Sequence, residues 1–397
     1  MLNIEESFNG KYAFTHLGFR PFFSAALGFA TAGILIWMLI YLNGWTMPAE
    51  NYPPALWHAH EMIFGYTLAV IAGFLLTAIK NWTGVQTLNG KPLLILFLIW
   101  LMARISPLVV SQAYLPLVAT IDLLFDAFLL VAVSLPIIKV KQWQNIVFPL
   151  ICLLIFISNL FFYSGLLDIF PAGLHLGLYS GFYILLAIIF IMGRRVIPFF
   201  IEKGVDENFQ ATNWRWLDIS SLVLLLCFVI SDLVNSNSPI TALLAASLFI
   251  LHCLRLYGWY TRGIWNNNLL WVLYLGYGWI VAGFLLKALS ITHGISVFIA
   301  IHSFAYGGIG MITIGMMARV ALGHTGRNVF DPPGILKIVF LSMLTGTIVR
   351  VIFPLVDSSH YSLWIGIAQL LWILSFMIML VVYLPMLIKA RVDGRPG

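Results

Sequence analysis

The sequence predicts an all-α protein that crosses a membrane about twelve times, and its composition supports this prediction. Of its 397 residues, 61% are hydrophobic and 9% are charged, whereas roughly 25% of an ordinary soluble domain is charged. A bilayer-spanning helix needs about 20 mostly apolar residues, so the apolar content suffices for about twelve such helices. These segments cross as helices, because hydrocarbon offers no hydrogen-bond partner to an open backbone.

Apolar runs that are interrupted by proline, glycine and charge define the individual spans. In order, we place them at 22–43, 57–79, 93–110, 115–138, 145–164, 174–193, 216–234, 239–258, 269–290, 294–318, 334–356 and 361–388. The first follows a polar stretch with Glu5, Glu6 and Lys11, which does not resemble a cleavable signal peptide. The polar loop 201–215 divides a single membrane domain, residues 1–397, into six and six spans, as in many secondary transporters. No internal repeat is apparent in this pattern.

The distribution of basic residues predicts the orientation of the chain. Lys and Arg gather on the cytoplasmic side of bacterial inner-membrane proteins. With both termini in the cytoplasm, all but three of the 21 Lys and Arg residues fall on that side, the exceptions being Arg104, Lys287 and Arg350. We therefore expect a multi-pass protein of a bacterial inner membrane, with cytoplasmic termini and the lipid bilayer as its surroundings. The net charge of +6 then needs no nucleic-acid partner.

The cysteines exclude several kinds of site. Cys152, Cys227 and Cys253 each lie inside an apolar run. They provide neither a disulfide framework nor a Cys-x-x-Cys zinc motif, and the Cys-x-x-Cys-His motif of covalently attached c-type haem is absent from the sequence.

Several polar residues are expected in the outer half of the bilayer. In this orientation His58, His60 and Glu61 lie in the first turn of 57–79, and His175 opens 174–193. His302 lies roughly 12 Å below the outer end of 294–318, at ~1.5 Å per residue. A charged side chain at such depth costs ~2.5–3.5 kcal/mol on insertion scales, so intramembrane ionic groups are functional candidates.

Arg104 and Asp122 lie at similar depth on the hairpin formed by the third and fourth spans. One interpretation is a structural ion pair, because buried charges are expected to pair. Asp126 follows one turn below Asp122 on the same helix face. Asp122 and Asp126 together form a possible proton relay, although one of them could instead stay protonated through desolvation.

The histidines are candidate metal ligands, because neutral imidazole suits iron and copper and sites in bundles are built from facing helices. A hydrogen-bonded packing role is the alternative for each. His58 and His60 point about 200° apart on a regular helix, so they cannot easily hold the same ion. Met62 shares a face with His58, and a thioether is a plausible copper ligand. Beyond His302, the segment Gly307-Gly308-x-Gly310 leaves room for a packed helix or a flat cofactor.

Five motifs extend in order over nearly the whole chain: GFRPFF at 18–23, WHAHEM at 57–62, NWTG at 81–84, GRRVIPFF at 193–200 and MARVALGHTGR at 317–327. Together, and in this order, they resemble the NnrS family. Taken singly, their cytoplasmic-face residues are also typical of interfacial anchors. These residues are Arg20, Asn81, Trp82, Arg194, Arg195, Arg319, His324 and Arg327.

The resemblance implies a haem- and copper-containing bacterial inner-membrane protein of nitric oxide metabolism, denitrification and nitrosative-stress defence. A b-type haem would then take His58 or His60 together with His302 as axial ligands. Arg104 and Arg350 would neutralise its propionates. Copper would be bound near His58, His60 and His302 with His175 and Met62 as companions.

Two other functions stay open from the sequence. One is a nitric oxide reductase with a single haem and an external electron donor. A complete haem-copper oxidase site is not expected, because the chain has no His-His pair and one histidine in 294–318. The other is a proton-coupled secondary transporter in which Asp122 and Asp126 carry the protons.

Overall fold

The computed structural model describes residues 13–50, 52–205 and 209–395, and within them the chain is helical with no β-strand. Twelve of its helices are long and apolar enough to cross a membrane, which confirms the predicted fold class. Glu5, Glu6 and Lys11 lie outside the described residues, as does part of the loop 201–215. The orientation of the termini stays a prediction.

The helices are joined by short connections. In chain order they are α1 (Phe19–Asn43), α2 (Pro54–His60), η1 (Glu61–Thr67), α3 (Leu68–Thr83), α4 (Gly90–Ile105), α5 (Leu115–Lys139), α6 (Val147–Leu166), α7 (Gly173–Gly204), α8 (Arg215–Val234), α9 (Pro239–Trp259), α10 (Asn268–His293), α11 (Val297–His302), η6 (Ser303–Gly310), α12 (Met311–His324), α13 (Leu336–Val351), α14 (Phe353–Val356) and α15 (Tyr361–Ile388). Here η1 and η6 are π-helical stretches that interrupt the second and tenth spans.

The chain forms two compact units. The first contains residues 1–184, 320–328 and 376–397, and the second contains 185–319 and 329–375. The chain first passes from one unit to the other inside α7. The reason is local packing. Early in α7, a Cβ at Gly177 would lie 2.6 Å from the Ser158 carbonyl oxygen of α6, whereas later the ring of Phe190 lies 4.1 Å from that of His252 in α9. The arrangement of six and six spans about the loop 201–215 stays a prediction.

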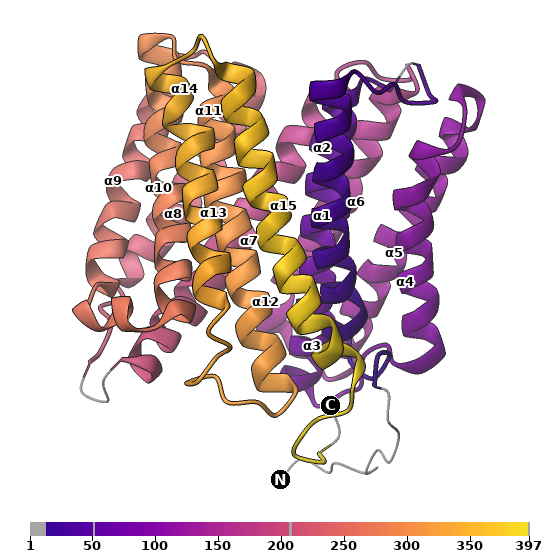
Figure 1. Ribbon diagram of the computed structural model, residues 1–397, viewed down its shortest axis with the longest axis vertical. Helices are drawn as coiled ribbons and strands as arrows, with labels where there is room; N and C mark the ends of the chain where they lie inside the picture. Colours follow the sequence, from indigo (N-terminus) through magenta and orange to yellow (C-terminus); the bar gives the residue numbers. More distant parts are fainter. Residues whose placement is uncertain (1–12, 51, 206–208, 396–397) are drawn as a thin grey trace. The chain divides into compact units, whose positions relative to one another are not determined.

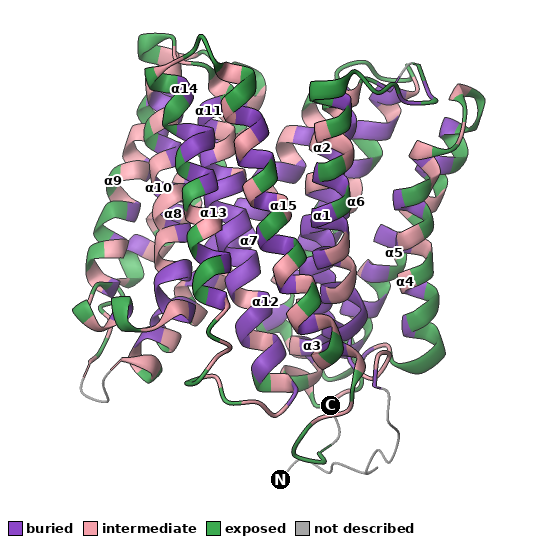
Figure 2. Ribbon diagram, in the orientation of Figure 1, coloured by how far each residue is buried: buried purple, intermediate pink, exposed green. Residues whose placement is uncertain are grey.

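Many helices have an exposed face, green along α4 and α5 in Figure 2, and large apolar side chains lie on it. Ile95 is 56% exposed, Leu117 54% and Leu135 61%. A water-soluble protein would bury such side chains, whereas lipid tails solvate them. This pattern fits contact with the bilayer.

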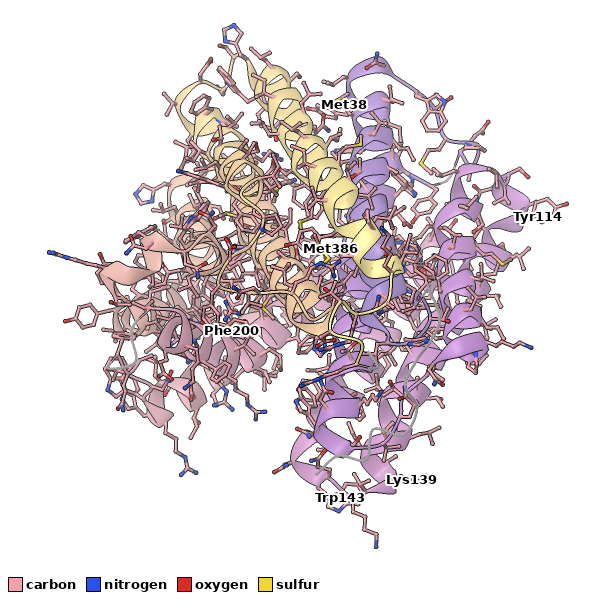
Figure 3. The ribbon with its side chains drawn as sticks, turned by 60° about the horizontal axis from the view of Figure 1, so that its bottom comes forward. Met38, Tyr114, Lys139, Trp143, Phe200 and Met386 are labelled. Carbon is pink, nitrogen blue, oxygen red and sulfur yellow. The ribbon has the colours of Figure 1, made fainter. Side chains whose placement is uncertain are left out.

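The α4–α5 hairpin of the first unit (Figure 1) shows which residues lie at the ends of a membrane span. Tyr114 precedes α5 and Lys139 ends it, so the two residues lie at opposite ends of that helix (Figure 3). Trp143 lies beside Lys139 at the start of the next span (Figure 3). Tyrosine, tryptophan and lysine at helix ends are typical of membrane–water interfaces.

Candidate functional site

Each unit contains a π-helical stretch that begins directly after a predicted histidine ligand. In the first unit η1 follows His60, and in the second η6 follows His302. A π-helix has i→i+5 hydrogen bonds, is rare, and occurs frequently at functional sites. The two histidines therefore mark the candidate sites, which we describe unit by unit.

Seven polar side chains of the first unit meet in its interior and form what we call the ionic cluster. All are at most 2% exposed. They come from α2, η1, α4, α5 and α6 and are His60, Glu61, Arg104, Asp122, Asp126, Asn159 and Tyr163.

Arg104 holds two acids of the ionic cluster at once. Its Nη1 donates to Glu61 Oε2 at 2.8 Å, and its Nη2 donates to Asp122 Oδ1. The Arg104–Asp122 ion pair confirms the pairing that the sequence suggested for this hairpin. Gly65 makes the approach possible, because a Cβ there would lie 2.8 Å from Glu61 Oε2 and 3.0 Å from Arg104 Nη1.

Asn159 determines how His60 is protonated. Its Nδ2 donates to Asp122 Oδ2 at 3.2 Å and to Asp126 Oδ2 at 2.8 Å, so its Oδ1 is an acceptor. His60 Nε2, at 2.9 Å, therefore donates to that oxygen. His60 Nδ1 lies 3.1 Å from Glu61 Oε1, so one proton must lie between these two atoms. Both ring nitrogens of His60 are thus engaged.

The ionic cluster contains more acids than bases. Glu61, Asp122 and Asp126 face one guanidinium, that of Arg104, and one imidazole. An isolated charge is expensive in such a buried place. The cluster can keep a low net charge only by holding protons, which is the property that a proton relay requires. The common hydrogen bonds to Asn159 also confirm that Asp122 and Asp126 share a helix face.

The sequence analysis missed Asn159 and Tyr163. Asn159 links both aspartates to His60, and the Tyr163 hydroxyl donates to Asp122 Oδ2 at 3.0 Å. The signal was present, because two polar residues four positions apart in an apolar run share one helix face.

His58, Met62 and His175 have surroundings of their own in the first unit. The half-buried His58 ring stacks on Trp37 of α1, with centroids 4.7 Å apart and an interplanar angle of 6°. His60 instead stacks on Phe162 of α6 at 4.4 Å, so the two histidines have different neighbours, as their spacing predicted. Met62 is half-buried beside α1, and the exposed His175 has its ring 4.5 Å from that of Tyr179.

The site of the second unit lies where η6, α13 and α15 meet. His302 Nδ1 lies 2.8 Å from the Phe298 carbonyl oxygen and 3.0 Å from Arg350 Nη2. The Arg350 guanidinium also lies 5.8 Å from the centre of the Tyr361 ring. The Tyr306 hydroxyl donates to the Ala368 carbonyl oxygen at 2.8 Å, which joins η6 to α15.

The glycines of η6 are packed by side chains. A Cβ at Gly307 would lie 2.6 Å from Thr347 and Trp279, and one at Gly310 would lie 2.7 Å from Trp372. The space expected beside these glycines therefore holds neighbouring side chains, which supports the packing alternative over a flat cofactor at these positions.

The predicted cytoplasmic-face motifs are held mainly by contacts near helix ends. In the first unit Arg20 donates to the Leu387 and Lys389 carbonyl oxygens at 2.9 and 2.7 Å, and so caps α15. In the second unit Arg194 pairs with Asp218 at 2.8 Å. The remaining motif residues lie as follows: His324 against Phe19, Trp82 against Phe148, Arg319 over Phe200, Asn81 and Arg195 exposed, and Arg327 half-buried.

Within residues 13–50, 52–205 and 209–395, no group of three or more His, Cys, Asp or Glu side chains is arranged to hold a metal ion. The twelve apolar helices in the described part of the chain, with ionic groups buried inside them, define a polytopic integral membrane protein. The chain belongs to the NnrS family, since the family model described as NnrS protein matches residues 13–391. No curated protein matches it. Family membership is consistent with a membrane protein related to nitric oxide.

Proposed function

We propose that this NnrS family member is a haem- and copper-binding protein of the bacterial inner membrane that acts in nitric oxide metabolism and nitrosative-stress defence. Haem is held at His302 in the second unit. Copper is held in the first unit by His58, Met62 and His175. The observation that carries the proposal is the environment of His302, directly before a π-helical stretch.

The surroundings of His302 fit a histidine that would hold a haem. A metal-ligating histidine usually donates its other ring N–H to a carbonyl or carboxylate oxygen. Nδ1 of His302 can either donate to the Phe298 carbonyl oxygen or accept from Arg350 Nη2, but not both. In the tautomer that binds a metal, the proton is on Nδ1 and is donated to the Phe298 carbonyl oxygen, the lone pair is on Nε2, and Arg350 gives up its bond to the ring. Arg350 lies beside the same ring and supplies positive charge for a propionate.

The ionic cluster fits a cofactor poorly. Both ring nitrogens of His60 are hydrogen-bonded, to Glu61 and Asn159, and Arg104 is occupied by two carboxylates. His60 and Arg104 could serve a haem only after these bonds break. This favours His58 over His60 as a ligand and Arg350 over Arg104 as a propionate partner. The pairing of His302 with His58 or His60 joins residues of different units and stays a prediction.

The donor set of the first unit suits copper by chemistry, since imidazole and thioether both bind it. His58 and Met62 lie on either side of the start of η1, and His175 opens α7. At His302 a haem would supply the capacity to bind nitric oxide at its iron. Reduction of nitric oxide would also require an electron donor.

An absorption spectrum tests the proposal. We expect the detergent-purified protein to show a Soret band, b-type bands after reduction with dithionite, and a shift on addition of nitric oxide. His302→Ala should lose the haem signal. His293→Ala, which removes an exposed histidine at the end of α10, should keep it. Equal haem content in both variants would contradict the role of His302.

Copper requires a separate measurement. Elemental analysis of the purified protein should find copper, and Met62→Leu should reduce the amount bound. Unchanged copper in Met62→Leu and in His58→Ala would exclude the proposed donor set.

The acid-rich ionic cluster favours a second candidate function, proton-coupled transport. In that case proteoliposomes with a pH gradient should take up a solute and lose the gradient as they do so, and Asp126→Asn should slow both. A colourless protein with this behaviour would favour transport over the haem proposal.

A further inference from the structure

The second and tenth spans carry the same sequence pattern, which the hydropathy analysis did not detect. Phe64 and Gly65 follow His60 by four and five residues, and Tyr306 and Gly307 follow His302 by the same distances. A Thr-Gly pair then ends the pattern in both spans: it lies 23 and 24 residues after His60, as Thr83-Gly84, and equally far after His302, as Thr325-Gly326.

The structure repeats along with the sequence. Each of the two spans runs from α-helix through a π-helical stretch to α-helix. Thr83 and Thr325 both donate to the carbonyl oxygen four residues earlier, at 2.7 Å in each case. Gly84 and Gly326 follow with φ of +70° and +76°, a left-handed conformation that glycine adopts without strain.

The next two spans extend the correspondence. Arg104 and Arg350 each lie in the last turn of a helix, α4 or α13, and a Pro-Leu-Val sequence follows both. Asp122 comes 18 residues after Arg104, and Gln369 comes 19 residues after Arg350. Leu-Leu follows both Asp122 and Gln369. Gln369 therefore holds the position in the second unit that Asp122 holds in the ionic cluster.

This position has a defined chemical role in the ionic cluster. The Asp122 carboxylate accepts hydrogen bonds from Arg104, Asn159 and Tyr163, so it is a built-in anion surrounded by donors. Gln369 is neutral and cannot supply that anion.

Gln369 is nevertheless buried. It is 6% exposed, and neither its Nε2 nor its Oε1 has a hydrogen-bond partner among the described residues. A buried amide without partners is rare and calls for an explanation such as a bound ion or ligand. The neighbouring Ala368 carbonyl accepts from Tyr306, and Tyr361 of the same helix faces the Arg350 guanidinium. Gln369 therefore belongs to the helix that meets η6 and α13.

We propose that His302, Arg350 and Gln369 form a binding site for a carboxylate-like monovalent anion, which takes the role that the Asp122 side chain has in the ionic cluster. Arg350 provides the positive charge, and the Gln369 amide donates through Nε2. The anion is either a small free oxyanion or a propionate of the haem at His302. The second source rests on the proposed function, and the first does not.

Formate is the probe, because it is the smallest carboxylate. With three non-hydrogen atoms, its Kd is about millimolar at best. We expect formate to raise the apparent melting temperature of the haem-free, full-length protein in a saturable way, at ionic strength matched with chloride. Gln369→Asp should lower the affinity for formate at least about tenfold, because its own carboxylate would occupy the donors.

Two further variants control this experiment. Gln369→Leu removes the amide without adding charge and should also weaken the formate response. Gln86→Asp adds the same charge at an exposed loop position and should leave it unchanged. If Gln369→Asp does not fold, the formate response of Gln369→Leu alone tests the proposal. The proposal would be overturned if the unaltered protein gave no saturable response. It would also be overturned if Gln369→Asp and Gln369→Leu responded to formate as strongly as the unaltered protein.

Haem loading then distinguishes the two sources. If haem abolishes the formate response, a propionate occupies the site. If the response persists in haem-loaded protein, the ligand is a free oxyanion. If the protein takes up no haem, the proposed function fails, but the response of the haem-free protein still tests the anion site.

Discussion

The ionic cluster of the first unit and the His302 site of the second have the same framework but different chemistry. Both combine a histidine before a π-helical stretch with an arginine in the last turn of a helix. In the ionic cluster the arginine pairs with Glu61 and Asp122. At the corresponding positions the second unit has Ser303 and Gln369, which carry no charge. One helical framework can thus carry its own anion or present an amide in its place.

The largest effect is expected from the guanidinium of the ionic cluster. Arg104→Met leaves Glu61 and Asp122 without their counter-charge, and breaking a buried ion pair in this way typically costs about 3–5 kcal/mol. Unfolding in mixed detergent–SDS micelles measures the loss. Adding Glu61→Gln to Arg104→Met should recover part of it. A loss below about 1 kcal/mol, typical of exposed pairs, would show that the cluster is not desolvated.

Gly65 tests how closely the cluster is packed. In Gly65→Ala the new methyl group would lie 2.9 Å from the Phe29 ring as well as beside Glu61 and Arg104. Overpacking of this kind typically costs about 1–3 kcal/mol. Gly28→Ala is the matched control, because its Cβ would meet nothing within 4 Å, and it should stabilise α1 by about 0.5–1 kcal/mol. Equal effects in both variants would argue against the tight packing.

Replacement of Gln369 by leucine should change the stability of the protein in the opposite direction to replacement of Asp122. Gln369→Leu removes two buried polar atoms without partners, so in buffer free of oxyanions it should stabilise the protein by about 1–2 kcal/mol. Asp122→Leu removes an acceptor that Arg104, Asn159 and Tyr163 share, and should destabilise it. The same unfolding assay measures both variants. Destabilisation by Gln369→Leu under these conditions would mean that the amide has partners inside the protein.

The smallest effect is expected at an exposed acid. Hydrogen bonds from Ser359 and His360 lower the pKa of Asp357, in the loop before α15, to about 2. Since the unfolded value is about 3.9, the stabilisation is present above about pH 4 and is lost as the pH falls towards 2. Asp357→Asn should therefore lower the melting temperature slightly at pH 5 and not at pH 2. A difference that grows below pH 3 would contradict this assignment.

Local sequence was sufficient for some of the site. Arg104 and Asp122 are close in sequence and joined by a tight hairpin, so their pairing followed from depth alone. The separation of His58 and His60 followed from helical periodicity. Helical periodicity and depth could not predict the bond from Arg104 to Glu61 or the bonds from Asn159 to the two aspartates. These contacts join separate helices, and residue spacing does not determine how separate helices pack.

The amino-acid sequence by itself determined the twelve apolar helices and the membrane class, since both depend on composition and on the length of apolar runs. The sequence also contained the family motifs. It contained the repeated pattern as well, in which His302 and Arg350 stand at the positions that correspond to His60 and Arg104. Only the tertiary structure decided which buried groups have partners. Hydrogen bonds among His60, Glu61 and Asn159 depend on distances of about 3 Å between separate helices, and neither hydropathy nor spacing sets such distances.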